Sequence, residues 1–217
     1  HQYGYLHNAI DCGNLIEDAV DSLCVLGSNL LPLGGRYEIW SLPKILGTSA
    51  GSVIWCKNIE DASAIRKLRD SANKNGFMQW TLRILGSKWI EFYYYWEGGE
   101  LYHNGKLPKI AIGDILKKIE SFDRIIEDRI KKLNILKHLV PDELILSRDR
   151  LPCLIPLTDL NSTVKSKLFK LGFNLNERHM VVYKNDSRGV IKFFPLPIHQ
   201  DVPLDIIIQV SKIIKNS

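Results

Sequence analysis

The stretch 161–215 decides the fold of the second half of the chain. It contains NSTVKSKLFKLG (161–172), ERHMVVYK (177–184), GVIKFFPLP (189–197) and VPLDIIIQVSKIIK (202–215). The outer two segments have apolar residues at helical spacing. The first begins with Asn161 or Ser162 as a cap and stops at Gly172, and the last has Pro203 in its first turn. The middle two are rich in β-branched and aromatic residues. The predicted order is therefore helix, strand, strand, helix.

The segment just before this stretch marks a boundary. Residues 141–159, PDELILSRDRLPCLIPLTD, carry three prolines and predict a linker. It separates an N-terminal α/β region, 1–140, from a C-terminal module, 160–217. Residues 112–139 have an apolar face and a face of mixed charge at helical spacing. This pattern predicts one long amphipathic helix that joins the two modules.

Shorter elements are expected further toward the N-terminus. Helical patterns cover 14–26 and 59–74, and strand patterns cover 37–40, 52–56 and the two runs on either side of Gly86–Ser87. The stretch 59–119 predicts a possible first module of order α-β-β-β-α. We therefore expect an α/β (α+β) protein of two small modules, with antiparallel sheets and helices on one face.

Composition and charge bound the function. The chain has 217 residues, of which 45% are hydrophobic and 24% charged, and its formal net charge is +5. Residues 1–60 hold 3 basic and 6 acidic side chains, and the rest of the chain holds 26 basic and 18 acidic ones. A basic surface attracts polyanions. This asymmetry favours a nucleic acid as partner.

The C-terminal segment resembles a known family. The resemblance is to the HicA family of bacterial mRNA-cleaving toxins, whose fold is like that of the double-stranded-RNA-binding domain. It covers about 160–215 and rests on Val164, Leu168, Leu171–Phe173, Arg178–Tyr183, Pro195–His199 and the last helix. It implies that His179 is the general acid or base in the attack of a ribose 2′-hydroxyl, a role that suits an imidazole. His199 is the second candidate catalytic residue, and Asp201 could orient it.

The basic residues of this segment are the expected nucleic-acid contacts. They are Lys165, Lys167, Lys170, Arg178, Lys184 and Lys192. We therefore expect a protein that binds RNA rather than DNA, with a metal-independent ribonuclease activity as a possibility. Two alternatives stay open: a non-enzymatic interaction or assembly module of a larger machine, and a sequence-specific DNA-binding or DNA-processing protein. The aromatic run 89–96 could form core or stack on bases.

Several motifs are absent from the sequence. It has no E-x-K triplet, P-loop, G-x-G-x-x-G or H-E-x-x-H motif, so we expect no metal and no cofactor. The four cysteines, Cys12, Cys24, Cys56 and Cys153, form no C-x-x-C pair and are expected to be free thiols in a reducing compartment. No run of 18 apolar residues occurs. The expected location is the cytoplasm, without a membrane partner.

Overall fold

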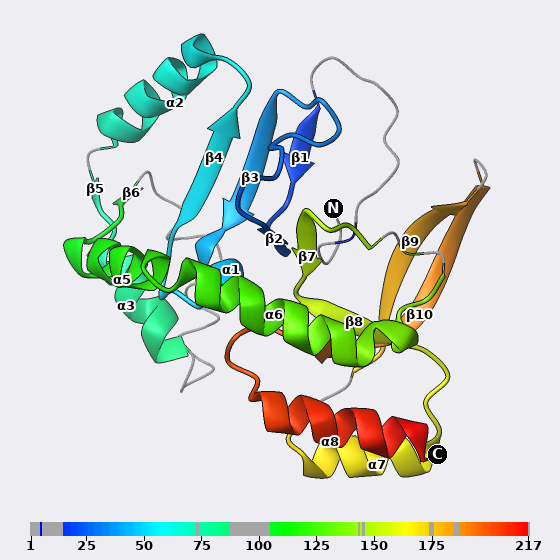
Figure 1. Ribbon diagram of the computed structural model, residues 1–217. Coiled ribbons are helices and arrows are strands. Elements are labelled where there is room, and N and C mark those ends of the chain that lie inside the picture. The colour runs from blue at the N-terminus through cyan, green and yellow to red at the C-terminus, as the bar shows by residue number, and fades with distance from the viewer. Residues whose placement is uncertain are drawn as a thin grey trace.

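The computed structural model describes residues 5, 15–72, 74–86, 105–142, 144, 146–173, 176–184 and 187–216. The predicted α/β (α+β) class is confirmed, because small, mainly antiparallel sheets combine with seven α-helices in the described part of the chain (Figure 1). Up to residue 119 the elements are β1 (Ile16–Asp18), β2 (Ser22–Cys24), β3 (Tyr37–Ser41), α1 (Leu42–Leu46), β4 (Ser52–Cys56), α2 (Ile59–Ser71), β5 (Lys74–Asn75), α3 (Phe77–Gly86), β6 (Gly105–Lys106) and α5 (Lys109–Ile119). The later elements are α6 (Phe122–Leu136), the 3-10 helix η2 (Lys137–Leu139), β7 (Arg150–Pro152), β8 (Leu154–Leu157), α7 (Ser162–Lys170), β9 (Arg178–Lys184), β10 (Ser187–Pro197) and α8 (Leu204–Lys215).

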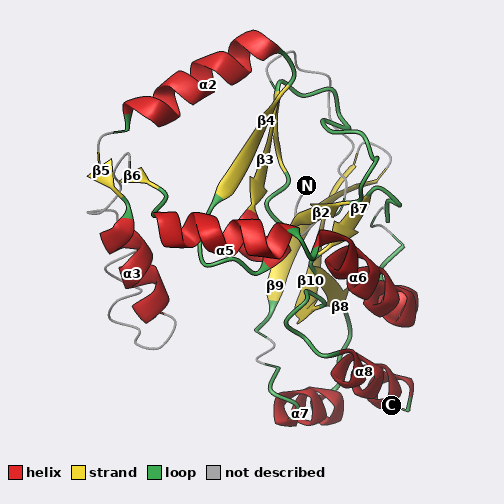
Figure 2. Ribbon diagram, turned by 60° about the vertical axis from the view of Figure 1, so that its left-hand side comes forward, coloured by secondary structure: helices red, strands yellow, loops and turns green. Residues whose placement is uncertain are grey.

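The C-terminal part has the order helix, strand, strand, helix that its sequence predicts. The Asn161 side chain accepts a hydrogen bond from the Val164 N–H at 2.9 Å and caps α7, and Gly172 follows the helix at φ +92°. β10 pairs with both β9 and β8 in the antiparallel sense. α7 and α8 lie side by side (Figure 2) and bury an apolar core against the sheet, with Ile155, Leu168 and Leu196 at its centre.

The predicted helix over 14–26 is wrong. The segment forms two short strands: β1 pairs in parallel with β3, and β2 pairs antiparallel with β7. Its apolar residues do recur at helical spacing. However, the turn that closes with the hydrogen bond from Ser22 N–H to the Ala19 carbonyl, at 3.0 Å, divides the segment. Pairing with strands distant in the sequence overrides the local helical pattern.

Two further predictions need correction. Residues 77–86, expected as a strand before a hairpin, form the amphipathic helix α3, and the second strand of that hairpin falls outside the described residues. The long helix over 112–139 is two helices, α5 and α6, which are divided at Glu120–Ser121. The division lets each helix pack against different partners, since α5 contacts α1 whereas α6 contacts β7 and α8.

The segment expected as a linker, 141–159, contains β7 and β8. β7 pairs with β2 of the N-terminal half, and β8 pairs with β10 of the C-terminal half. α6 contributes to both apolar cores, with Ile125 and Ile126 in one and Leu136 in the other. Arg129 and Lys132 lie between these two apolar ends of the helix and are fully buried.

A buried ion pair between Glu38 and Arg150 links β3 to β7. The Arg150 guanidinium donates to the Glu38 carboxylate, and both side chains are 1% exposed or less. The same carboxylate accepts hydrogen bonds from the Trp40 indole N–H at 2.6 Å and from the Leu31 N–H at 2.6 Å. A neighbouring carboxylate, that of Glu17, accepts from the Gly35 N–H at 2.8 Å. These contacts hold the loop between β2 and β3 in place.

A second, more exposed pair holds the start of α2. The Arg36 guanidinium donates two hydrogen bonds to the Asp61 carboxylate, at 2.7 and 2.5 Å. Asn58 caps the same helix through the Asp61 N–H at 2.8 Å. The hydrogen bonds from Arg36 hold the pKa of Asp61 at about 2, below its usual range.

We expect Arg150→Met to lower the free energy of unfolding by about 3–5 kcal/mol, because it leaves the buried Glu38 carboxylate without its cation. Urea denaturation measures the change. Arg148→Met, at an exposed position two residues earlier, is the matched control and should change stability by no more than about 0.5 kcal/mol. Equal effects of the two variants would contradict the structural role of the pair.

We expect Asp61→Asn to reduce the loss of stability in acid. The pKa of Asp61 is lowered on folding, so its contribution is fully present above a pH of about 4 and is lost as the pH falls toward about 2. Urea midpoints measured at several pH values should therefore fall more steeply for the wild type than for the variant. Parallel pH profiles would show that this ion pair does not act on stability.

Candidate active site

The candidate site lies where the parallel strands β1 and β3 end. Asp18 pairs with Ile39 in the register of this pair, and the Ala19 N–H donates to the Ile39 carbonyl at 3.0 Å. The carboxyl ends of both strands therefore meet at one edge of the sheet, which is the edge where α/β proteins commonly bind ligands. Asp18 is the last residue of β1, Asp21 lies three residues beyond it, and α1 follows directly from β3.

Lys44 and Asp21 form an ion pair at this edge. The Lys44 ammonium is 2.8 Å from the Asp21 carboxylate, and the two side chains are 51% and 18% exposed. α1 buries Leu42, Ile45 and Leu46 against the N-terminal core, so Lys44 lies off the buried face. The result is an accessible amine held beside a carboxylate.

The loop between β10 and α8 lies against the end of α1. α1 ends at Gly47 with φ +69°, and a Cβ added there would lie 2.7 Å from the Gln200 side-chain nitrogen. Only a glycine fits both the backbone angle and the close approach. Residues 199–201 are thereby brought to the same edge as Lys44, although more than 150 positions separate them in the sequence.

α6 adds two buried cations behind this loop. The Arg129 guanidinium donates to the Gln200 side-chain oxygen at 3.0 Å, and burial lowers the pKa of Arg129 to about 10. The Lys132 ammonium donates to the His199 carbonyl at 2.9 Å and forms an ion pair with Asp128, one turn earlier. Lys132 is thus fully engaged, whereas Arg129 is not.

Cys153 lies within electrostatic range of both the Lys44–Asp21 ion pair and the Arg129 guanidinium. Its thiol lies between β7 and β8, and burial raises its pKa to about 12, so it is neutral. Asp21, Arg129 and Lys44 all act on it electrostatically. The ion pair at the end of α1 and the guanidinium from α6 therefore lie near the same thiol.

His199, which the sequence singled out, lies beside this cluster. Its Nδ1 is 3.4 Å from the Asp201 carboxylate and accepts a hydrogen bond from the Asp201 N–H at 3.3 Å. Burial lowers the pKa of His199, an effect that the Asp201 charge opposes. In this geometry the group of Asp201 that donates to the ring is its backbone N–H.

The other predicted site residues are on separate elements. His179 lies on β9, is 56% exposed, and its Nε2 is 3.9 Å from the Glu177 carboxylate. Lys192 is opposite His179 in the strand register, and the Lys165 ammonium lies 4.1 Å from the centre of the Phe194 ring. The exposed members of the set are Lys165, Lys167, Lys170, Arg178 and Lys192, while Lys184 is placed only through the backbone of β9. No contact within the described residues joins this set to Lys44.

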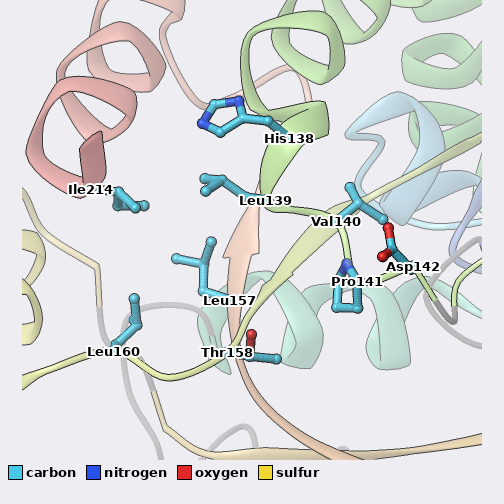
Figure 3. Close-up of a pocket in the computed structure, with 9 residues that line it drawn as sticks. All are labelled: His138, Leu139, Val140, Pro141, Asp142, Leu157, Thr158, Leu160 and Ile214. Carbon is cyan, nitrogen blue, oxygen red and sulfur yellow. The ribbon is translucent and has the colours of Figure 1, made fainter.

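A separate cavity of about 350 Å³ lies near the C-terminal end of α6 (Figure 3). It is lined mainly by apolar side chains, with His138, Asp142 and Thr158 as its polar members; the others are Leu139, Val140, Pro141, Leu157, Leu160 and Ile214. No amine or guanidinium contributes to this lining. The cavity therefore differs chemically from the edge of the sheet at which Lys44 and Asp21 lie, which we call the Lys44 edge.

Neither a metal-binding cluster nor a membrane-spanning helix occurs in the part of the chain that the structure describes. The residues that the structure describes include no group of three His, Cys, Asp or Glu side chains that could hold a metal ion. None of the described helices is long and apolar enough to cross a membrane.

Sequence reasoning missed Lys44, Asp21 and Arg129. A lysine just after a strand and before a glycine turn has no specific spacing on which to base a prediction. Asp18 and Asp21 lie within 14–26, for which the pattern predicts a helix, and Arg129 lies within the predicted helix 112–139 without being assigned to either of its faces. Only the parallel pairing of β1 with β3, and the burial of α6, show these residues as one site.

A family model described as "Putative PLP-dependent aminotransferase" matches the chain over residues 1–217. No curated protein and no solved structure matches it. The family match corrects the resemblance to HicA toxins. It also overturns the expected ribonuclease, the nucleic-acid partner and the two alternative functions, since they belong to other classes of protein.

We expect Gly47→Ala to destabilise the chain more than Gly34→Ala does. Both glycines have φ near +70°, which costs an alanine about 1–2 kcal/mol, but only the Cβ at position 47 meets another side chain. That contact displaces the Gln200 amide, which binds Arg129. Urea denaturation should show that the excess cost vanishes when Gly47→Ala is made in a Gln200→Ala background. A persisting excess would mean that the loop does not press on α1.

Proposed function

We propose that Lys44 holds pyridoxal phosphate (PLP) in this chain, which belongs to the putative PLP-dependent aminotransferase family. The observation that carries the proposal is the accessible Lys44 amine 2.8 Å from the Asp21 carboxylate, at the carboxyl ends of two parallel strands. Enzymes of this kind hold the cofactor on a lysine amine and use an acidic or basic side chain at its ring nitrogen.

The chemistry of the donor set supports Lys44 over other lysines. Lys132 is buried, but its ammonium is occupied by Asp128 and by the His199 carbonyl. The cavity near the C-terminal end of α6 has neither an amine nor a guanidinium in its lining. The Lys44 edge combines an amine that solvent can reach, the Asp21 carboxylate beside it and, through Gln200, a buried guanidinium with unsatisfied donors.

Each residue of this edge has a role in the proposed function. When bound, the cofactor supplies an electron sink for the carbon that loses a proton. Asp21 orients the Lys44 Nζ, and Asp18, the last residue of β1, is the carboxylate proposed for the ring nitrogen. Lys44 Nζ, once released, can accept a proton from the substrate carbon and return one.

The cytoplasmic location stays a prediction. Within the described residues the thiols of Cys24 and Cys56 form no disulfide, and this supports the prediction because disulfides are rare in reducing compartments.

The test of this function is covalent labelling. We expect full-length chain mixed with PLP and reduced with borohydride to carry a stable adduct on Lys44, located by peptide mass spectrometry. Lys44→Ala should lose this adduct and lower the rate of amino-group transfer by at least about a hundredfold, because the group that bonds the cofactor and moves the proton is gone. We expect the loss of the adduct and the lower rate to follow from the change of this one lysine.

Lys117→Ala, at an exposed position on α5, is the matched control and should be labelled like the wild type. An adduct spread over several exposed lysines, or one that persists in Lys44→Ala, would refute the role of Lys44. Asp21→Asn should fold normally yet weaken the binding of PLP, because the amine loses its partner.

A further inference from the structure

Arg129 differs from the other buried cations that the structure describes. Lys132 is paired with Asp128, and Arg150 is paired with Glu38. Arg129 is 0% exposed and forms no ion pair within 4 Å in the described part of the chain. Its one hydrogen bond there goes to a neutral amide, that of Gln200.

Most of the donors of this guanidinium have no acceptor. Nε and Nη1 are buried and unpartnered. Since Nε carries one N–H and Nη1 carries two, three of the five donors are unsatisfied. Asp128 and Asp201 act on Arg129 electrostatically, but neither forms an ion pair with it. Buried donors without an acceptor lower stability, and an anion that accepted from them would remove this cost.

The position of Arg129 relates it to the Lys44 edge. Gln200, which accepts its hydrogen bond, lies against Gly47 at the end of the helix that carries Lys44. Cys153 is within electrostatic range of both Arg129 and Lys44. A single side chain, that of Gln200, therefore lies between the Arg129 guanidinium and the end of α1.

We propose that Arg129 binds a small oxyanion in the site headed by Lys44. Guanidinium donors match the geometry of carboxylates and phosphates, and a buried site strengthens such charged hydrogen bonds. The assignment of the oxyanion as a substrate carboxylate or the cofactor's phosphate rests on the proposed function. Binding of the oxyanion itself does not require Lys44.

The test compares stability with and without oxyanions. Urea midpoints of the full-length chain are measured in sodium chloride, sodium acetate and sodium phosphate at equal ionic strength. The wild type should become more stable in acetate or in phosphate, because an anion that binds only the folded state stabilises it. Arg129→Met should be at least as stable as the wild type in chloride, since an apolar side chain replaces an unpaired buried charge.

Arg129→Met should also bind the oxyanion about tenfold or more weakly. Phosphate stabilises many proteins without binding, so the response of the wild type counts only where it exceeds that of Arg129→Met. Arg124→Met, exposed on the same helix, is the matched control and should respond like the wild type. If Arg129→Met does not fold, Arg129→Gln replaces it.

The outcomes separate the sources of the oxyanion. A response to acetate alone supports a carboxylate ligand, and a response to phosphate alone supports the phosphate of the cofactor. Equal responses of wild type and Arg129→Met, or a large loss of stability of Arg129→Met in chloride, would overturn the proposal. Lys44→Ala should keep the response. A failed labelling of Lys44 would therefore remove the proposed function and leave the role of Arg129 standing.

Discussion

The Glu38–Arg150 ion pair is the constraint on which the rest of the structure depends. It joins β3 to β7 across 112 positions of sequence, inside the protein. β3 leads directly into α1 with Lys44, and β7 leads through Cys153 into β8. By fixing these two strands, the pair fixes the position of Lys44 relative to the thiol and to the sheet of the C-terminal half. Because both charges are buried, they are stable only together.

The candidate site is assembled from segments that are far apart in the chain. Asp21 contacts Lys44, and Gln200 lies against both Gly47 and Arg129, because β1 runs parallel to β3 and α6 packs between two apolar cores. The charges of the site are arranged unequally. The carboxylates Asp21 and Asp128 are paired with lysines, while the guanidinium of Arg129 has only an amide. Arg129 is therefore the buried cation of this cluster that forms no ion pair within the described residues.

Local sequence signals predicted some elements correctly and failed at others for physical reasons. Capping residues and periodicity act within a few positions of the chain. They predicted α2, the strands near 37–41 and 52–56, and the helix–strand–strand–helix order of the C-terminal part. β1 and β2 could not be predicted because distant strands select their conformation. The function was wrong because an order of elements is shared by unrelated proteins. His199 was singled out and lies near the cluster, but no local pattern indicated Lys44, Asp21 or Arg129.

The two buried cations of α6 have different surroundings within one helix. Arg129 and Lys132 are three positions apart and therefore project from neighbouring positions on one face. Apolar residues on either side of them, Ile126 and Leu136, belong to different cores and hold the helix in place. Lys132 is neutralised within its own helix and ties the loop at His199 to α6. The rigid frame this provides allows Arg129 to stay unpaired, because the packing of its neighbours outweighs the penalty of one buried charge.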